Sequence, residues 1–199
     1  MRLQIGLILF DDAEELDFVG PWEVFAAARM AKPERFEPVL ISQTGAKVRC
    51  AKGMAVEAQK SFAEMPALDV ILVPGGQGTR REAKNPAMLD YIARVAPSCS
   101  WVTSVCTGSL LLTTAGPARG KRVTTHWSFI EPLRSQGQAA EVLEQVRFVR
   151  DGNVLTAAGV SAGIDMALWL LGQLESPAFA RQIQRYIEYH PAPPYAAEV

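Results

Sequence analysis

The sequence predicts a single α/β domain in which helices cover both faces of a mostly parallel sheet. Apolar runs of strand length alternate along the chain with longer segments of helical period, which is the pattern of parallel strands joined by helices. The chain has 199 residues, of which 49% are hydrophobic and 21% are charged, so it is long enough to bury one sizeable core. We expect a domain over residues 1–190 and a C-terminal tail over residues 191–199.

Short apolar runs mark the strands. The predicted strands are Leu3–Phe10, Phe36–Ser42, Val70–Pro74, Trp101–Val105, Arg122–Thr124, Val146–Arg150 and Asn153–Ala157. Asp151-Gly152 joins the last two and favours a two-residue antiparallel hairpin, so we expect one antiparallel strand late in the sheet. Thr44-Gly45 before Val48 predicts a second, smaller hairpin.

Segments of helical period lie between these strands. The predicted helices are Pro21–Met30, Pro86–Val95, Gly108–Ala115, Trp127–Ser135, Ala162–Leu174 and Pro177–Tyr189. Three of them open with proline, whose missing N–H costs nothing in the first turn of a helix. Three prolines after His190 prevent a helix from continuing into the tail.

Composition excludes several classes of protein as leading interpretations. Lys and Arg number 20 against 21 Asp and Glu, without a basic block, so we expect no nucleic-acid partner. The longest apolar stretches, Ile5–Phe10 and Met166–Leu171, are far shorter than the roughly 20 residues of a membrane span. The N-terminus has no cleavable signal, which predicts a cytoplasmic protein. Three cysteines at irregular spacing, with two histidines, favour neither a disulfide framework nor a metal site.

Cys106 occupies the most informative position in the chain. Ser104-Val-Cys106-Thr-Gly108 leads from a predicted buried strand into a predicted helix, with small residues two positions before and after the cysteine. This is the spacing of a nucleophile elbow, which lifts a side chain out of a sheet at a helix N-terminus. A structural buried cysteine is the alternative for a lone Cys. The elbow spacing favours a nucleophile, and we expect its pKa to be lowered toward a reactive thiolate.

A glycine-rich loop follows the strand that ends at Pro74. Gly75 and Gly76 let backbone N–H groups approach a ligand closely. A phosphate loop is disfavoured because no Gly-Lys-Ser/Thr follows. An oxyanion hole formed by the N–H groups of Gly76 and Thr107 fits better, and a simple tight turn is the remaining alternative.

Two further side chains are candidates for proton transfer. Asp17 lies between Leu16 and Phe18, where burial would raise its pKa into the range of a general acid or base. A helix-capping aspartate near Pro21 is an equally weighted interpretation. His126 lies where a predicted strand passes into a helix, and it either lines the site or caps and packs.

These motifs together resemble the ThiJ/PfpI superfamily, whose fold is like that of the class I glutamine amidotransferases. The resemblance covers nearly the whole chain. The matching segments are Leu16-Asp17-x-x-Gly20-Pro21-x-Glu-Val-Phe25, Val73-Pro-Gly-Gly76, Ser104-Val-Cys106-Thr-Gly108, Thr124-Thr-His126-Trp127 and Thr156-x-x-Gly159-x-x-Ala-Gly-Ile-Asp165. The resemblance implies a flavodoxin-like, doubly wound sheet and a homodimer.

Within the superfamily, an Asp in the first loop with Cys-Thr at the elbow is most similar to the isonitrile hydratases. This implies catalytic roles for Cys106, Asp17 and Thr107, no cofactor or metal, and a small isonitrile as the substrate. The peptidase-like members carry a histidine directly after the cysteine, where this chain has Thr107. The glutaminases use a late His and Glu, and here only His190 and Glu188 are present, near the tail.

Two other classes of function stay open on these motifs. Glyoxalase-like relatives use a cysteine and an acid on a reactive aldehyde. The sensor domains of AraC-type regulators share the motifs as non-catalytic ligand-binding or redox-sensing modules, but they continue into a DNA-binding region that this sequence does not contain.

Overall fold

The computed structural model describes residues 2–191, and its centre is a seven-stranded sheet in the order β10-β11-β7-β6-β1-β2-β5. The strands of this sheet are β1 (Leu3–Leu9), β2 (Phe36–Ser42), β5 (Lys60–Ser61), β6 (Val70–Val73), β7 (Trp101–Val105), β10 (Phe148–Asp151) and β11 (Val154–Ala157). Every pairing is parallel except that of β10 with β11. The predicted parallel sheet with one late antiparallel strand is confirmed.

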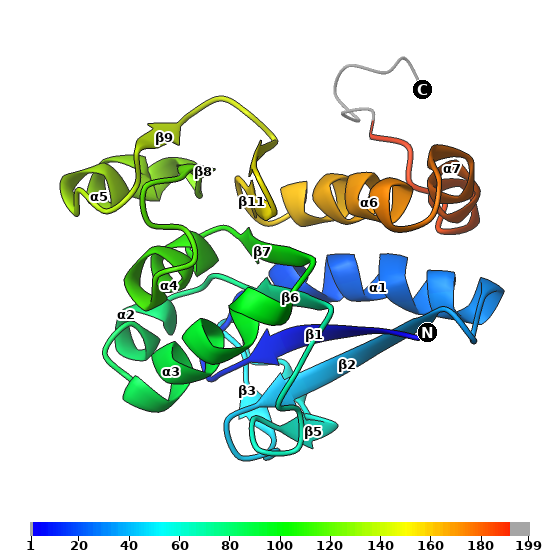
Figure 1. Ribbon diagram of the computed structural model, residues 1–199, viewed down its shortest axis with the longest axis horizontal. Helices are drawn as coiled ribbons and strands as arrows, with labels where there is room; N and C mark the ends of the chain where they lie inside the picture. Colours follow the sequence, from blue (N-terminus) through cyan, green and yellow to red (C-terminus); the bar gives the residue numbers. More distant parts are fainter. Residues whose placement is uncertain (1, 192–199) are drawn as a thin grey trace.

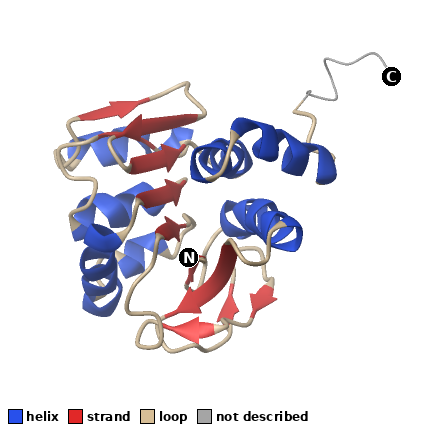
Figure 2. Cartoon of the chain, turned by 45° about the vertical axis from the view of Figure 1, so that its right-hand side comes forward, coloured by secondary structure: helices blue, strands red, loops and turns tan. Residues whose placement is uncertain are grey.

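Helices cover both faces of this sheet (Figures 1 and 2). On one face α1 (Glu15–Ala31), α6 (Ala162–Leu174) and α7 (Pro177–Tyr186) contact one another. On the other face α4 (Gly108–Ala115) contacts α2 (Thr79–Glu82) and α3 (Pro86–Val95). The doubly wound α/β architecture is therefore confirmed.

Smaller elements surround the sheet. They are the antiparallel pair β3 (Val48–Arg49) and β4 (Ala55–Val56), the parallel pair β8 (Arg122–Thr124) and β9 (Glu141–Leu143), α5 (Ile130–Ser135) and two short 3₁₀ helices, Ala96–Ser98 and Trp127–Phe129. The prediction that Thr44-Gly45 turns a hairpin was wrong. Val48 does begin a hairpin strand, but the strand pairs with β4 across the Cys50–Met54 turn, where the Cys50 N–H donates to the Met54 carbonyl at 2.8 Å.

The first helix begins earlier than proline indicated. α1 begins at Glu15, so Pro21 lies inside the helix and Asp17 lies in its first turn. Pro21 has no N–H to donate to the carbonyl of the residue four positions earlier, which is Asp17. Tertiary packing compensates for this loss, because Pro21 is buried and lies against α6 near Gly163.

The other boundaries follow the predictions closely. α3, α4 and α6 have the predicted bounds, while the predicted Trp127–Ser135 helix divides into a 3₁₀ turn and α5. The last helix ends at Tyr186 and not at Tyr189. Of the predicted tail, residues 192–199 lie outside the described residues.

Candidate active site

Four neighbouring parallel strands end at the same edge of the sheet, and the residues just beyond them form the site. β11, β7, β6 and β1 are adjacent in the sheet order. Cys106 follows β7, Gly75 and Gly76 follow β6, and Val160 follows β11. The carboxyl edge of a doubly wound sheet is where such folds bind ligands.

Cys106 lies on the tight turn between β7 and α4. Its φ is +55°, a left-handed conformation that is unusual for a residue with a side chain. The Cys106 N–H donates to the Ala157 carbonyl at 3.1 Å, which continues the β7–β11 ladder by one residue and fixes the turn. The elbow geometry predicted from the spacing is therefore present, and the Cys106 side chain is 7% exposed.

Two glycines make this turn possible by close approach. A Cβ on Gly75 would lie 2.5 Å from the Thr107 nitrogen and 2.7 Å from the Cys106 Cβ. A Cβ on Gly108 would lie 2.1 Å from the Val73 carbonyl oxygen. The β6 loop and the elbow therefore pack backbone to backbone, with no space for a side chain between them.

The expected lowering of the Cys106 pKa was wrong. Burial, and after it the negative charge of Asp17, raise the pKa of the Cys106 thiol to about 12. The Thr107 N–H and hydroxyl both favour the thiolate, but they do not outweigh these effects. Sequence spacing identified the turn, but it could not show that burial and the neighbouring Asp17 would dominate the pKa of the sulfur.

Asp17 is completely buried, and it is close enough to Cys106 for its negative charge to raise the pKa of the thiol. The Gly75 N–H donates to Asp17 Oδ2 at 2.8 Å, while Oδ1 is buried without a hydrogen-bond partner among the described residues. Burial raises the pKa of Asp17 to about 7, although the nearby N–H groups of Gly75 and Val160 favour its charged form. The hydrogen bond that Asp17 accepts through Oδ2 comes from the Gly75 N–H and not from an N–H at the start of α1. Of the two interpretations weighed for Asp17, the buried titratable acid is the one that the structure supports.

The Thr107 hydroxyl is held by the neighbouring loop. The Gly76 N–H donates to Thr107 Oγ1 at 3.0 Å, and Thr79 Oγ1 lies 3.1 Å from the same atom. Thr79 in turn donates to the Gly76 carbonyl at 2.8 Å. The Gly76 N–H thus has a partner already and does not point unpaired into the site, whereas the Thr107 N–H faces the Cys106 sulfur.

His126 has both of the roles considered for it. Its Nδ1 accepts from the Ser128 N–H and lies 2.8 Å from Ser128 Oγ, so the ring caps the Trp127–Phe129 turn. The ring also lies against Gly159, where an added Cβ would be 2.7 Å from His126 Cδ2. His126 lines the same cavity as Cys106.

That cavity is small, and its lining surface is polar and apolar in about equal parts. It encloses about 150 Å³, and its lining includes Cys106, Thr107 and His126. Glu14, Arg80 and Val160 also line it, and sequence reasoning missed all three. Val160 follows β11, and its place at the cavity depends on the order of the strands in the sheet, which the sequence alone does not give. Its φ of +44° is strained for a β-branched side chain.

The β3–β4 hairpin closes one side of the cavity. The Ala51 N–H donates to the Ala13 carbonyl at 2.9 Å, and Ala51 lines the cavity. Lys52 pairs with Glu14 through its ammonium group. The hairpin is therefore attached to the segment that leads into Asp17.

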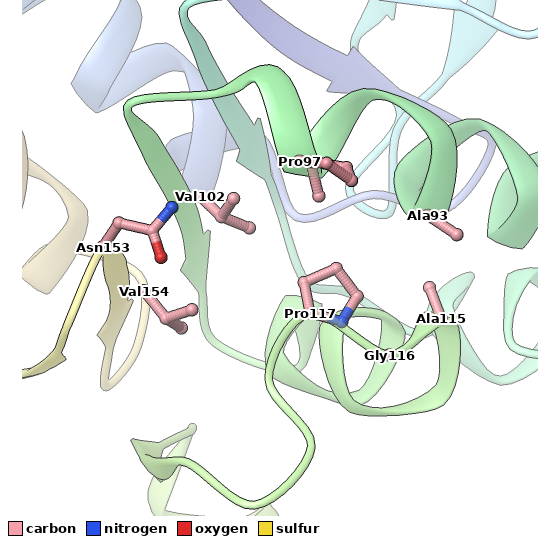
Figure 3. A pocket seen from close by; sticks show the side chains of 9 residues that line it. Ala93, Pro97, Val102, Ala115, Gly116, Pro117, Asn153 and Val154 are labelled. Carbon is pink, nitrogen blue, oxygen red and sulfur yellow. The ribbon is translucent and has the colours of Figure 1, made fainter.

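A separate hollow of about 320 Å³ lies at the opposite edge of the sheet (Figure 3). It is lined near the starts of β7 and β11 by Val102 and Val154, and by Pro97 and Pro117. No titratable side chain lines it. The chemistry of the molecule is concentrated at the carboxyl edge.

Within residues 2–191, no group of three His, Cys, Asp or Glu side chains is placed to hold a metal ion. The helices of the same region are too short or too polar to cross a membrane.

Comparisons with known proteins agree with this architecture. The chain is 40% identical to the isonitrile hydratase of Pseudomonas putida over 98% of its own length and 82% of the relative. It is 27% identical to the HTH-type transcriptional regulator CdhR of Pseudomonas aeruginosa, over 92% of this chain but only 54% of the regulator. The crystal structure of a ThiJ/PfpI family protein from Pseudomonas syringae superposes with a TM-score of 0.89 at 30% identity, covering 100% of this chain and 80% of that one. The DJ-1/PfpI family model matches residues 4–173, and the chain belongs to the DJ-1/PfpI family.

Proposed function

We propose that this chain is an isonitrile hydratase, which adds water to a small R–N≡C substrate and releases an N-substituted formamide. The observation that carries the proposal is a buried thiol at the elbow turn, Cys106, beside a buried acid, Asp17, whose pKa is about 7. The P. putida relative, which is similar over nearly the whole chain, is itself named an isonitrile hydratase.

The first step adds the Cys106 S–H bond across the terminal carbon of the isonitrile. That carbon carries a lone pair, so it needs a proton as well as a nucleophile. Asp17, ionised in part near neutral pH, takes the thiol proton and passes it to the carbon as the C–S bond forms. The product is a thioimidate, R–N=CH–S, on Cys106. A thiol that keeps its proton until the substrate arrives suits this step, because sulfur and proton are both delivered.

The second step hydrates the thioimidate. Asp17 takes a proton from water as the oxygen adds to the carbon, and it passes that proton to the nitrogen. Asp17 then carries the proton of the new hydroxyl group to the sulfur as the tetrahedral carbon expels it, and the formyl C=O forms. A thiol is a far better leaving group than this neutral nitrogen, which would need a second proton to leave as an amine, so the C–N bond stays intact.

The surrounding groups have supporting roles in the proposal. The Thr107 N–H, which faces the sulfur, stabilises negative charge on it as the proton leaves. The Gly76 N–H acts through the Thr107 hydroxyl that it holds, and Gly75 orients Asp17. His126 lines the cavity and helps to bind the substrate.

The proposal includes a homodimer and a cytoplasmic location, and it requires neither a cofactor nor a metal. Trp127 is 81% exposed and Met30 is 72% exposed, and side chains of this kind are often covered in oligomers. All three cysteines are free, as in proteins of reducing compartments. Sedimentation equilibrium would measure the assembly directly.

The decisive assay follows two substrates by mass spectrometry. The protein is incubated with an alkyl isonitrile and, separately, with methylglyoxal. We expect formamide from the first and no turnover of the second. Turnover of methylglyoxal alone would favour the glyoxalase-like alternative, and inertness toward both would favour a sensor.

A further inference from the structure

The residues around the cavity also indicate which isonitriles fit it. An alkyl isonitrile would be expected to bind among apolar side chains, yet apart from Ala51 and Val160 the side chains that line the Cys106 cavity are mostly polar or charged. Two charged side chains, Glu14 and Arg80, belong to this lining. They differ in whether each forms an ion pair with another residue.

The Glu14 carboxylate pairs with the Lys52 ammonium, although its negative charge still contributes to raising the pKa of Asp17 and of Cys106. Arg80 has no acidic partner among the described ion pairs of residues 2–191. Within residues 2–191, the Arg80 guanidinium in the cavity lining therefore forms no ion pair with a carboxylate.

The Arg80 guanidinium is also fixed in position. Its Nη1 donates to the Gly76 carbonyl at 3.0 Å and to Thr79 Oγ1 at 3.2 Å. Its Cζ lies 4.6 Å from the centre of the Phe129 ring, a stacking that restrains the plane of the group. Only Nη1 takes part in these hydrogen bonds, so the edge formed by Nε and Nη2 remains available within the described part of the chain. This edge matches the two oxygens of a carboxylate.

Arg80 is connected to the reacting centre by short steps. The Gly76 carbonyl that it binds also accepts from Thr107 Oγ1 at 3.2 Å, and Thr107 is the residue after Cys106. Arg80 is exposed while Cys106 is buried, so the guanidinium lies at the mouth of the cavity and the thiol at its base.

We propose that Arg80 selects isonitriles that carry a carboxylate on the carbon bearing the nitrogen, or on the next carbon. The carboxylate binds the free edge of Arg80 at the mouth, and the linear isonitrile group extends inward to Cys106. The products are then N-formyl amino-acid-like carboxylates. This inference rests on the proposed function, and it adds the substrate class to it.

The test compares isocyanoacetate with its uncharged methyl ester, using wild type, Arg80→Gln and Arg181→Gln. Arg181 is an exposed arginine on α7, outside the cavity, and serves as the matched control. We expect wild type and Arg181→Gln to favour isocyanoacetate by at least tenfold in kcat/KM, mainly through KM. In Arg80→Gln this ratio should fall to about one. Equal kcat/KM for the two substrates in wild type, or the same ratio in Arg80→Gln as in wild type, would overturn the inference while leaving hydration itself intact.

Binding of the product tests carboxylate recognition by Arg80 without requiring any turnover. Calorimetry should show that wild type binds N-formylglycine more tightly than N-formylglycine amide by about tenfold, and that Arg80→Gln binds both equally. If neither isonitrile is hydrated, the proposed function fails, and this measurement still decides whether Arg80 recognises a carboxylate. If longer neutral isonitriles bind best, the R group extends instead into the adjoining hollow of about 440 Å³ beside Trp127, and Arg80 has no selective role.

Discussion

Cys99 and Cys106 are both buried, and burial raises the pKa of each thiol to about 12, yet their surroundings are entirely different. Cys99 has ordinary extended backbone and donates from its sulfur to the Val95 carbonyl at 3.4 Å. Cys106 has a φ of +55°, opens into a cavity and lies beside a fully buried acid. The comparison shows that a raised thiol pKa does not distinguish Cys106 from Cys99. What distinguishes Cys106 is that its neighbouring acid, Asp17, is fully buried and that Cys106 lines a cavity.

Removing each thiol should separate the two regions most strongly. We expect Cys106→Ala to reduce isonitrile turnover to the background rate with the fold intact, because the nucleophile is lost with little change of volume. Cys99→Ala should keep its turnover and lose about 1 kcal/mol of stability, because a buried contact is removed. Steady-state kinetics and chemical denaturation of both variants measure these effects. Turnover by Cys106→Ala near the wild-type rate would remove the thiol from the mechanism.

The buried acid should also make stability depend on pH. The pKa of Asp17 is raised from 3.8 to about 7 by burial, so the folded protein holds a proton that the unfolded chain releases between these values. The free energy of unfolding should therefore be highest below about pH 4 for this group and fall as pH rises to 7, by up to about 4 kcal/mol. Denaturation of wild type and Asp17→Asn across this range tests the sign. Parallel profiles for the two proteins would contradict the raised pKa.

Asp17→Asn should lower kcat by roughly 10²-fold or more, because the amide keeps the shape of the side chain but cannot exchange a proton. Asp69 is the matched control, since its charge raises the pKa of Cys99 as that of Asp17 raises the pKa of Cys106. Asp69→Asn should leave kcat within a fewfold of wild type. A similar loss in both variants would mean that general destabilisation explains the effect.

The sequence predicted more of the fold than of the candidate site. Asn85 caps α3 by accepting from the Ala87 N–H, and Pro86 occupies its first position, so local sequence determined where that helix begins. Pro21 misled the prediction for α1 because packing against α6 tolerates a proline within the helix. The elbow at Cys106 was visible in the spacing of small residues. The raised pKa of the Cys106 thiol could not be predicted from that spacing, because it depends on burial and on Asp17, which is 89 positions away in the sequence. Arg80 and Val160 reach the cavity only through the order of strands in the sheet, which residue spacing does not encode.

The smallest expected effect is on the rate of Cys106 alkylation in Asp17→Asn. This rate should rise, whereas the turnover of the same variant falls. Removing the negative charge of Asp17 should lower the pKa of Cys106, and the thiolate fraction at pH 8 rises roughly tenfold for each unit of that change. Asp17→Asn should therefore react faster with iodoacetamide at Cys106, although it turns over substrate more slowly. Peptide mapping with mass spectrometry locates the label. Slower alkylation in Asp17→Asn would show that Asp17 activates the free thiol and does not restrain it.

One experiment in ¹⁸O-labelled water tests the proposed mechanism most directly. In this mechanism sulfur and a proton both add to the isonitrile carbon, and sulfur later leaves. Isonitrile is turned over by wild type, with rapid-quench mass spectrometry of both the protein and the products. We predict a transient adduct of one isonitrile on the Cys106 peptide, and formamide that carries ¹⁸O on its formyl group with its C–N bond intact. Release of free amine in proportion to turnover, or labelled formamide without any adduct on Cys106, would contradict the mechanism.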